Sequence, residues 1–452
     1  MALKQIDALA ALREAAGEVI ETSLCDVQGN WLALVNTEEG KRLAFAAKGE
    51  AALSALWKDV EKEADVKDVH VSVMALNANN AALVRRYVKW TAPTACGTKG
   101  ASIGFSDWLG EADAVVAELF GKRQLKPVLV DFTTEDSEAL QRYFVQAVDT
   151  ATWGVLEEGY KEGYGANAAG LKTEEEIVKA LLYGYSMIGF DCSDKIDLGI
   201  EKLSDEAVDK RFEQFNEPFR AAVHASYLNA EFKVGTSKIT FTENQLHRIV
   251  LEYGEAIMHI QFIYNSYLKN TPWDIDFELD LSKPGKVLTP QEHYLIGNEL
   301  QRNGIKLSSI CLDPLKDAEA VNDNLQLHCE IADTFGYRLS FKNADIAMED
   351  TAAAMKYLKG KVHFKMNNIL WMSAIELAKA LDADLFGKLC AACGCEPTAD
   401  AADRALVLGY RKALNPKEEG NVVADMKAFL EAHHAEYAAA IKENVAAKLK
   451  NI

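Results

Sequence analysis

The stretch that decides the fold is PVLVDFTTEDSEALQRYFVQAVDTATWGVLEEG, residues 127–159. It begins with a short apolar run, 127–132, that is typical of a buried strand, and it continues into a long helical segment, 137–159. A strand followed by a helix is the βα unit from which parallel sheets are built. The neighbouring sequence repeats this alternation in both directions.

Short apolar strands recur through the middle of the chain, separated by helical segments such as 324–336. The further predicted strands are 101–107, 186–191, 274–281, 305–313, 337–343 and 361–366. Seven strands, or eight if the alternating stretch 68–77 is included, predict an α/β fold closed into a (β/α)8 TIM-like barrel rather than an open sheet. About eighty mostly helical residues between Asp191 and Asp274 are expected to form an insertion on the barrel rim.

Three regions follow from this prediction in a chain of 452 residues, which is long enough for one large domain with additions or for two domains. Residues 1–95 are expected to form a small N-terminal α/β unit. Residues 96–400 are expected to form the barrel, with the helical insertion at about 195–272. Residues 401–452 are expected to form a C-terminal helical segment.

The composition is that of a soluble globular protein, with 49% hydrophobic and 26% charged residues. A net charge of −19 argues against nucleic acid or an anionic membrane as a partner, because both require a basic surface. Charged residues interrupt the apolar residues at the N-terminus, so we expect neither a signal peptide nor a membrane span. Eight scattered cysteines do not suggest a disulfide scaffold, and we expect a cytoplasmic location.

A glycine-rich stretch, TWGVLEEGYKEGYGANAAGLKTEEE, occupies residues 152–176. Thr173 and Glu176 have the spacing of a capping box, which predicts a helix that begins near Glu174. Glycine is costly in regular structure and is used for tight turns or for close approach of the backbone to a ligand. We therefore expect an irregular loop before this helix, folded over the mouth of the pocket.

The carboxyl ends of the predicted strands are polar, and in a (β/α)8 barrel these ends carry the site. Lys342 and Lys365 each directly follow an apolar strand residue. If their strands are adjacent, the two ammonium groups would flank one cavity and favour an anionic ligand. The other polar strand-end residues are Ser106, Asp107, Asp131, Asp191, Asp194, Asp280, Ser282, Lys283, Asp313, Asn343, Asn367 and Asn368.

Histidines and cysteines give weaker signals. His363 lies inside a predicted strand and His328 inside an amphipathic helix, so both are expected to be core residues rather than metal ligands. The C-x-x-C-x-C spacing of residues 390–395 could hold zinc, but a structural zinc site needs four ligands and no fourth is within reach in the sequence. We expect a packing role for these cysteines.

Several further blocks can be read beside the glycine-rich stretch DTATWGVLEEGYKEGYGANAAGLKTEEEI (149–177), which is the most specific of them. The others are SIGFSDWLG (102–110), FDCSDKID (190–197), TPQEHYLIGNELQRNGIK (289–306) and GKVHFKMNNILWMSAIELA (360–378). In this order the blocks resemble the tagaturonate epimerase family, and the resemblance covers about residues 95 to 395. The resemblance implies a barrel and, in active members, a metal-dependent C4 epimerisation between tagaturonate and fructuronate. A divalent cation would polarise substrate oxygens there while acid and base residues move protons.

The resemblance breaks down at the metal site. Where the family pattern has histidines or carboxylates, this chain has Gly170, Lys195, Ser282, Lys283 and Lys342. Affinity for a divalent cation depends on the number and type of ligands. The resemblance therefore implies that the metal ligands are lost here, so no metal-binding residue is assigned and the cofactor stays open.

A small anionic carbohydrate is the ligand that these observations favour, and the oligomeric state is not predicted. The catalytic candidates are Lys283, Lys342, Lys365 and Asp191. The candidates for substrate contact, including the two residues Trp153 and Lys172 of the most specific block, are Asp107, Trp153, Lys172, Asp194, Lys195, Asn343 and Asn367.

Three functions remain open. The chain could be an isomerase of carbohydrate metabolism that epimerises a hexuronate, a sugar-acid-binding paralogue without activity, or an aldolase or isomerase without metal. In the last case a desolvated lysine with a lowered pKa would form a Schiff base. An active site needs converged groups with shifted pKa values, whereas an inactive pocket should hold lysines that are already paired with carboxylates.

Overall fold

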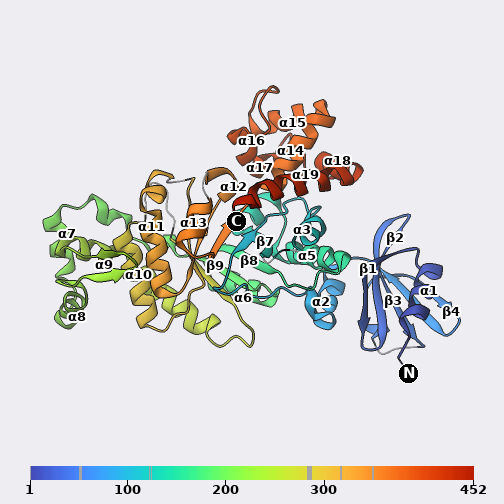
Figure 1. The fold of residues 1–452 in the computed structure, drawn as a ribbon, viewed down its shortest axis with the longest axis horizontal. Coiled ribbons are helices and arrows are strands. Elements are labelled where there is room, and N and C mark those ends of the chain that lie inside the picture. Colours follow the sequence, from blue (N-terminus) through green and yellow to red (C-terminus); the bar gives the residue numbers. More distant parts are fainter. Residues whose placement is uncertain are drawn as a thin grey trace.

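Eight parallel strands close into a barrel in the computed structural model of the protein, which confirms the predicted (β/α)8 fold (Figure 1). The structure describes residues 2–49, 53–121, 123, 125–281, 288–315, 318–348 and 351–452. The barrel strands, in their order around the barrel, are β6 Ser102–Gly104, β7 Lys126–Thr133, β8 Gly165–Leu171, β9 Met187–Asp191, β12 Asp276–Asp280, β13 Ser309–Leu312, β14 Arg338–Phe341 and β15 Val362–Lys365. Strand β15 pairs with β6 and closes the ring.

The strand that the sequence prediction missed is β8, which lies in the glycine-rich stretch. Its sequence, GANAAGL, lacks the β-branched and aromatic residues that favour strands, but β7 and β9 pair with it on both sides. The alternative eighth strand, 68–77, belongs to the N-terminal sheet instead. The predicted loop over the pocket mouth is wrong, because residues 159–164 connect a helix to the amino end of β8.

Helices follow the barrel strands and cover the outside of the barrel. They are α3 Asp113–Phe120, α4 Thr134–Leu140, α5 Phe144–Glu158, α6 Glu174–Leu182, α10 Pro290–Arg302, α11 Ala318–Phe335, α12 Ala344–Ala347 and α13 Thr351–Tyr357. The helix that follows β15, α14 Ile369–Leu381, belongs to the C-terminal lobe described below. The predicted capping box begins α6, where Thr173 and Glu176 each accept a hydrogen bond from the other's backbone N–H. The single helix predicted for 137–159 is two helices, because Gln141 adopts a left-handed conformation (φ 51°) that ends α4.

One glycine of the opening stretch, Gly154, allows α5 to pack closely against α3. A Cβ at Gly154 would lie 2.7 Å from the backbone nitrogen of Ala114. We expect Gly154→Ala to lower the free energy of unfolding by about 1–3 kcal/mol through this overlap. The matched control is Gly387→Ala in helix α15 (Ala383–Cys393), where a Cβ would meet no atom within 4 Å and should raise stability by up to about 1 kcal/mol. Urea unfolding measures the free energy of unfolding of both variants. Equal changes relative to the wild type would contradict the proposed overlap at Gly154.

The N-terminal unit is an antiparallel sheet with one helix on each face (Figure 1). Helix α1 packs on one face, and helix α2 with part of α5 packs on the other. Its elements are α1 Gln5–Ala15, β1 Glu18–Val27, β2 Asn30–Thr37, β3 Gly40–Lys48, η1 Ser54–Leu56, β4 Val60–Val66, β5 Val69–Met74, α2 Ala78–Tyr87 and η2 Lys89–Thr91. The strand order is β1-β2-β3-β5-β4.

The insertion after β9 lies at the opposite end of the molecule from the N-terminal sheet (Figure 1). It is mostly helical, as predicted, but it also contains a two-stranded hairpin. Its elements are η3 Ser193–Lys195, η4 Leu198–Lys202, α7 Asp205–Phe212, α8 Glu217–Tyr227, β10 Phe232–Val234, β11 Ser237–Ile239, α9 Glu243–Ile263 and the π-helical segment η5 Tyr264–Leu268.

A C-terminal helical lobe completes the chain. It includes α14 and α15, which begin before the predicted boundary at residue 401, because α14 packs against both α15 and α19. The remaining elements are α16 Arg404–Leu408, α17 Tyr410–Ala413, α18 Val423–Ala432, α19 His434–Lys448 and η6 Leu449–Asn451. None of the helices in the described ranges is long and apolar enough to cross a membrane.

Candidate functional site

The interior of the barrel is unusually polar. Successive side chains of a strand point to opposite faces, so β12 turns Asp276, Glu278 and Asp280 inward while Phe277 and Leu279 face the helices. Other buried polar residues of the barrel strands are Ser102, Asp131, Asn167, Ser309, Arg338, Ser340, His363 and Lys365. Barrels of this fold are commonly filled by branched apolar side chains, so the charged interior is a specific feature of this chain.

Lys365 is the centre of the interior network and is only 2% exposed. Its Nζ lies 2.5 Å from Glu278 Oε1 and 3.5 Å from Asp131 Oδ1. Burial by itself lowers the pKa of Lys365, but the two carboxylates outweigh burial and hold this pKa well above its ordinary value. Burial raises the pKa of both carboxyl groups, yet Lys365 and His363 together, with Asn167 also lowering the pKa of Asp131, outweigh burial and keep each pKa below its ordinary value. All three groups are therefore charged at neutral pH.

A hydrogen-bonded chain surrounds Asp131. Asn167 Nδ2 donates to Asp131 Oδ1 at 2.9 Å, and His363 Nε2 lies 3.6 Å from Asp131 Oδ2. On its other side His363 Nδ1 lies 2.9 Å from Ser102 Oγ, which also accepts a bond from Arg338. Within the described residues, Asp131 Oδ2 and His363 Nε2 are buried without a hydrogen-bond partner. Buried polar atoms are normally satisfied, so these two are suited to a water or a ligand group.

Acid should destabilise the protein through this network. Because the pKa values of Asp131 and Glu278 are lower in the folded chain, their stabilisation is fully present above the unfolded values of 3.8 and 4.5 and is lost as pH falls through the folded values. We expect the free energy of unfolding to fall by up to about 1.4 kcal/mol per pH unit for each such carboxyl group below about pH 4.5. Urea unfolding between pH 7 and pH 3 tests this, and Glu278→Gln should show a shallower slope.

The rim of the barrel carries a row of alternating charges at the carboxyl ends of β8, β9, β12 and β14. Lys172 Nζ lies 3.1 Å from Asp194 Oδ1 and 3.6 Å from Asp191 Oδ2. Asp191 is aligned with Asp280 on the neighbouring strand, and Asp280 forms an ion pair with Lys342. The structure thus brings together four of the predicted strand-end residues and the predicted substrate-contact residue Lys172 in one charged rim.

The lysine chemistry that the sequence left open is not supported by these contacts. Burial lowers the pKa of Lys342, but the Asp280 carboxylate outweighs burial and raises this pKa above its ordinary value. The pKa of Lys365 is raised for the same reason. A protonated amine is not a nucleophile, so the raised pKa values of Lys342 and Lys365 do not support the open alternative of a Schiff-base lysine with a lowered pKa.

Three predicted residues join neither the rim nor the interior network. Trp153 lies in the core between α5 and the N-terminal sheet, so the structure removes it from the substrate-contact candidates. Lys195 points to helix α9, where its Nζ lies 2.9 Å from Glu255 Oε1. Asp107 follows β6, and both of its carboxylate oxygens accept backbone N–H groups, from Gly110 at 2.8 Å and Ala112 at 2.7 Å. Asp107 therefore shapes its own loop.

Asn343 and Asn367 lie beyond β14 and β15, close to the network. Asn343 Oδ1 accepts a bond from Asn368 Nδ2 at 3.2 Å, and Asn367 Nδ2 donates to the backbone oxygen of Asp131 at 3.4 Å. The Oδ1 atom of Asn367 is buried without a partner in the described part of the chain. Lys283 and its neighbour Ser282 lie outside the described residues.

The described residues of the barrel mouth do not fit the divalent cation that the resemblance implies. Gly170, the residue before the end of β8, has φ +71° and offers no side-chain ligand atom, and Lys342 holds Asp280 in an ion pair. Within the described ranges, one group of at least three possible ligand atoms from His, Cys, Asp or Glu comes together. This group lies in the insertion and not among the barrel strands. Cys390 is buried, and Cys393 and Cys395 are partly buried.

The sequence prediction did not select Asp131, Glu278 and His363 as site residues, although they form the best-connected part of the interior. Asp131 was one polar strand end among many, and His363 was expected to be a core residue, which is correct for its burial. The signal that could have found Glu278 is the strict alternation of charged and apolar residues in DIDFELDL, 274–281. In a barrel strand, such alternation places every charge on the inner face.

A closed barrel of eight parallel strands with charged side chains at its carboxyl end defines the chain as a (β/α)8-barrel protein. The chain belongs to the tagaturonate epimerase family (UxaE), whose sequence model matches residues 20–436. The family resemblance in the sequence is thereby confirmed, and with it the relation to carbohydrate epimerases.

Named relatives agree with this membership. The tagaturonate/fructuronate epimerase of Thermotoga maritima is 27% identical over 383 residues, which cover 82% of this chain and 78% of that protein. The native crystal structure of the fructuronate-tagaturonate epimerase of Cohnella laeviribosi matches with a TM-score of 0.85 at 24% identity, covering 98% of both chains. The crystal structure of its complex with two glycerol molecules gives a TM-score of 0.86 and also covers 98% of both chains. At this identity the crystal structures show that the fold is shared.

Proposed function

We propose that the chain binds a hexuronate-like anionic sugar at the carboxyl end of its barrel, with lysine ammonium groups in the place of a divalent cation. The family membership and the named substrates of the Thermotoga maritima relative support a sugar acid as the ligand. A sugar acid carries one carboxylate and several hydroxyl groups. The rim lysines can donate to the carboxylate, and the rim carboxylates can accept from the hydroxyls.

The observation that carries this proposal is the ion pair between Lys342 and Asp280. Lys342 stands where the resemblance implies a histidine, and its raised pKa keeps it positive. Lys172, whose side chain is 42% exposed, supplies a second cation that a ligand can reach on the same rim. Fixed positive charge without a metal suits binding of an anion, but it does not supply the Lewis acid of a metal-dependent epimerisation.

A second function, C4 epimerisation without a metal, is favoured by one observation. Asp131 and His363 face each other at 3.6 Å inside the barrel, each with a buried atom that has no hydrogen-bond partner in the described part of the chain. Buried ionisable side chains that lie this close together are often found at active sites. An imidazole beside a carboxylate is also a common arrangement for moving a proton.

The two functions are separated by an NMR time course of the purified protein with tagaturonate, with and without Mn²⁺, Ni²⁺ or Zn²⁺, combined with calorimetric titration. We expect binding without conversion under every condition. Conversion without metal would favour the second function. Conversion only with metal would overturn both the binding function and the metal-free epimerisation, because a cation site would then have to exist in addition to the rim described above. Absence of binding would overturn the sugar-acid assignment itself.

A rim variant links binding to the proposed contacts. We expect Lys172→Met to weaken sugar-acid binding by roughly tenfold or more, because a charge-assisted hydrogen bond contributes about 1.5–3 kcal/mol. The matched control is Lys179→Met on helix α6, which removes a lysine that is paired with Glu175 on the helix surface. Equal affinities of the two variants would contradict a role for Lys172.

A further inference from the structure

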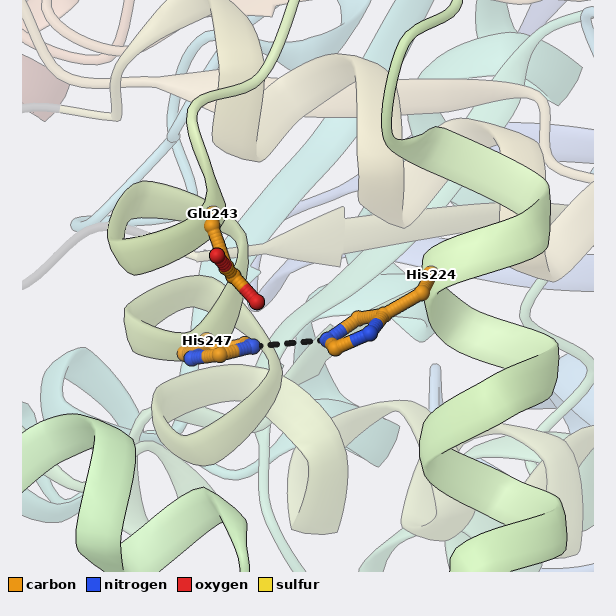
Figure 2. Close-up of side chains that lie close together, drawn as sticks. All are labelled: His224, Glu243 and His247. Atoms are coloured by element: carbon orange, nitrogen blue, oxygen red, sulfur yellow. Dashed lines mark hydrogen bonds between the residues drawn. The ribbon is translucent and has the colours of Figure 1, made fainter.

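We propose that His224, Glu243 and His247 form a binding site for one divalent cation of the zinc class in the helical insertion (Figure 2). His224 comes from α8, and the other two residues come from the first turns of α9. One ligand atom of each residue lies within 4.8 Å of the others. The inference is independent of the proposed function, because none of the three residues belongs to the barrel.

The spacing of these atoms suits a small cation with imidazole and carboxylate ligands. Glu243 and His247 are four residues apart, so they project from the same face of α9. Nε2 of His247 points at Nε2 of His224 at 2.8 Å, as Figure 2 shows. Two nitrogens bound tetrahedrally to zinc at about 2.0–2.1 Å would lie about 3.4 Å apart. The ion would therefore fit between the two histidines if their rings moved apart by about half an ångström.

The outer contacts hold His247 in the orientation that a metal ligand needs. Its Nδ1 lies 2.7 Å from Oδ1 of Asp209 on α7, so that Nε2 can present its lone pair to a cation. Metal-binding histidines typically donate their second N–H to a carboxylate in this way. Asp209 is fixed in turn by Asn244 at 3.1 Å, and Phe212 stacks on His247 with ring centroids 3.8 Å apart.

A second histidine pair in the same chain shows that contact between imidazoles is not sufficient. His293 and His328 approach to 2.9 Å, and Tyr337 contacts the other nitrogen of His293. Burial lowers the pKa of both histidines, which suits a neutral hydrogen-bonded pair. No third metal-ligating residue joins them among the described residues. The pair of the insertion differs because Glu243 flanks it and Asp209 orients it.

Three protein ligands leave the fourth position of a tetrahedral ion to water, and the exposed Glu243 keeps this side open to solvent. The ion would join α8 to α9 directly and α7 through Asp209. Helix α9 also packs against η3, the segment that carries the rim residue Asp194. Metal binding should thus stabilise the insertion on which part of the rim rests.

The test uses the full chain, stripped of metal with a chelator and titrated with Zn²⁺ in competition with a chromogenic chelator. We expect one high-affinity equivalent, visible bands of tetrahedral Co²⁺ on cobalt substitution, and a higher melting temperature with zinc. His224→Gln and Glu243→Gln should each weaken binding by roughly 100-fold, and Asp209→Asn by roughly 10- to 100-fold. His434→Gln, which removes an exposed histidine on α19, should leave the affinity unchanged.

Two results would overturn the site. One is that the wild-type chain binds zinc no more tightly than the His224→Gln and Glu243→Gln variants. The other is high-affinity binding that persists in both variants, which would place the ion elsewhere, for example on the cysteines of residues 390–395. Circular dichroism of each stripped variant shows that it is folded before titration.

Discussion

The Lys365→Met protein is expected to be less stable than the wild type by roughly 3–5 kcal/mol at neutral pH. Lys365 is the cation between Asp131 and Glu278, and all three side chains are almost fully buried. Removing the ammonium leaves two carboxylates in a medium of low polarity without a compensating charge, and breaking a buried ion pair from one side has a large cost. Urea unfolding at pH 7 measures the loss.

The pH dependence of this variant distinguishes lost charge compensation from lost packing. Without Lys365, burial would raise the pKa of Asp131 and Glu278, so stability would be lost as pH rises through the raised values. The difference from wild type should therefore shrink as pH falls toward 4. A difference that stays constant with pH would contradict the electrostatic account. Lys195→Met, which breaks an exposed ion pair with Glu255, is the control and should cost no more than about 1 kcal/mol.

The second large effect is expected for Gly104→Ala, which should lower the free energy of unfolding by about 3 kcal/mol or more. Gly104 faces Asp131 across neighbouring barrel strands. A Cβ at Gly104 would overlap Asp131 Oδ2 and lie 3.1 Å from its Cγ. Asp131 Oδ2 ends a short side chain whose other oxygen, Oδ1, is held by Asn167 and Lys365, so the carboxylate cannot turn away from the new Cβ without disturbing these contacts.

Gly254→Ala is the matched control for this steric effect. Gly254 lies in helix α9, and a Cβ there would meet no atom within 4 Å, so alanine should raise stability by up to about 1 kcal/mol. Thermal and urea unfolding of both variants give the comparison. If Gly104→Ala were as stable as the wild type, the carboxylate of Asp131 would not be fixed where the structure places it.

The tertiary structure explains why the fold was largely predictable. Seven of the barrel strands contain Val, Ile, Leu or Phe, in short apolar runs or alternating with polar residues, and such segments between helices carry a strong local signal. Strand β8 carries no such signal, because its small residues are adapted to the tight space around them. A Cβ at Gly165, for example, would lie 2.9 Å from Cys96 Sγ. The contacts that make β8 a strand come from its neighbours and not from its own side chains.

The candidate site was predictable at its rim and not in its interior. The sequence alone determined that Lys342 and Asp191 end strands, because each follows a recognisable apolar run. It could not determine the charge state of the lysines, since this depends on which carboxylate lies beside each of them. Lys365 and Glu278 are 87 positions apart in the chain, and only closure of the barrel brings them to 2.5 Å.

The sequence by itself thus determined the βα alternation, the acidic surface charge and the family, since these depend on local pattern and on composition. The tertiary structure alone decided that the lysines are paired cations and that His224 meets His247 across two helices. The physical reason is that electrostatic energies depend on distance and burial, and neither can be read from positions along a chain.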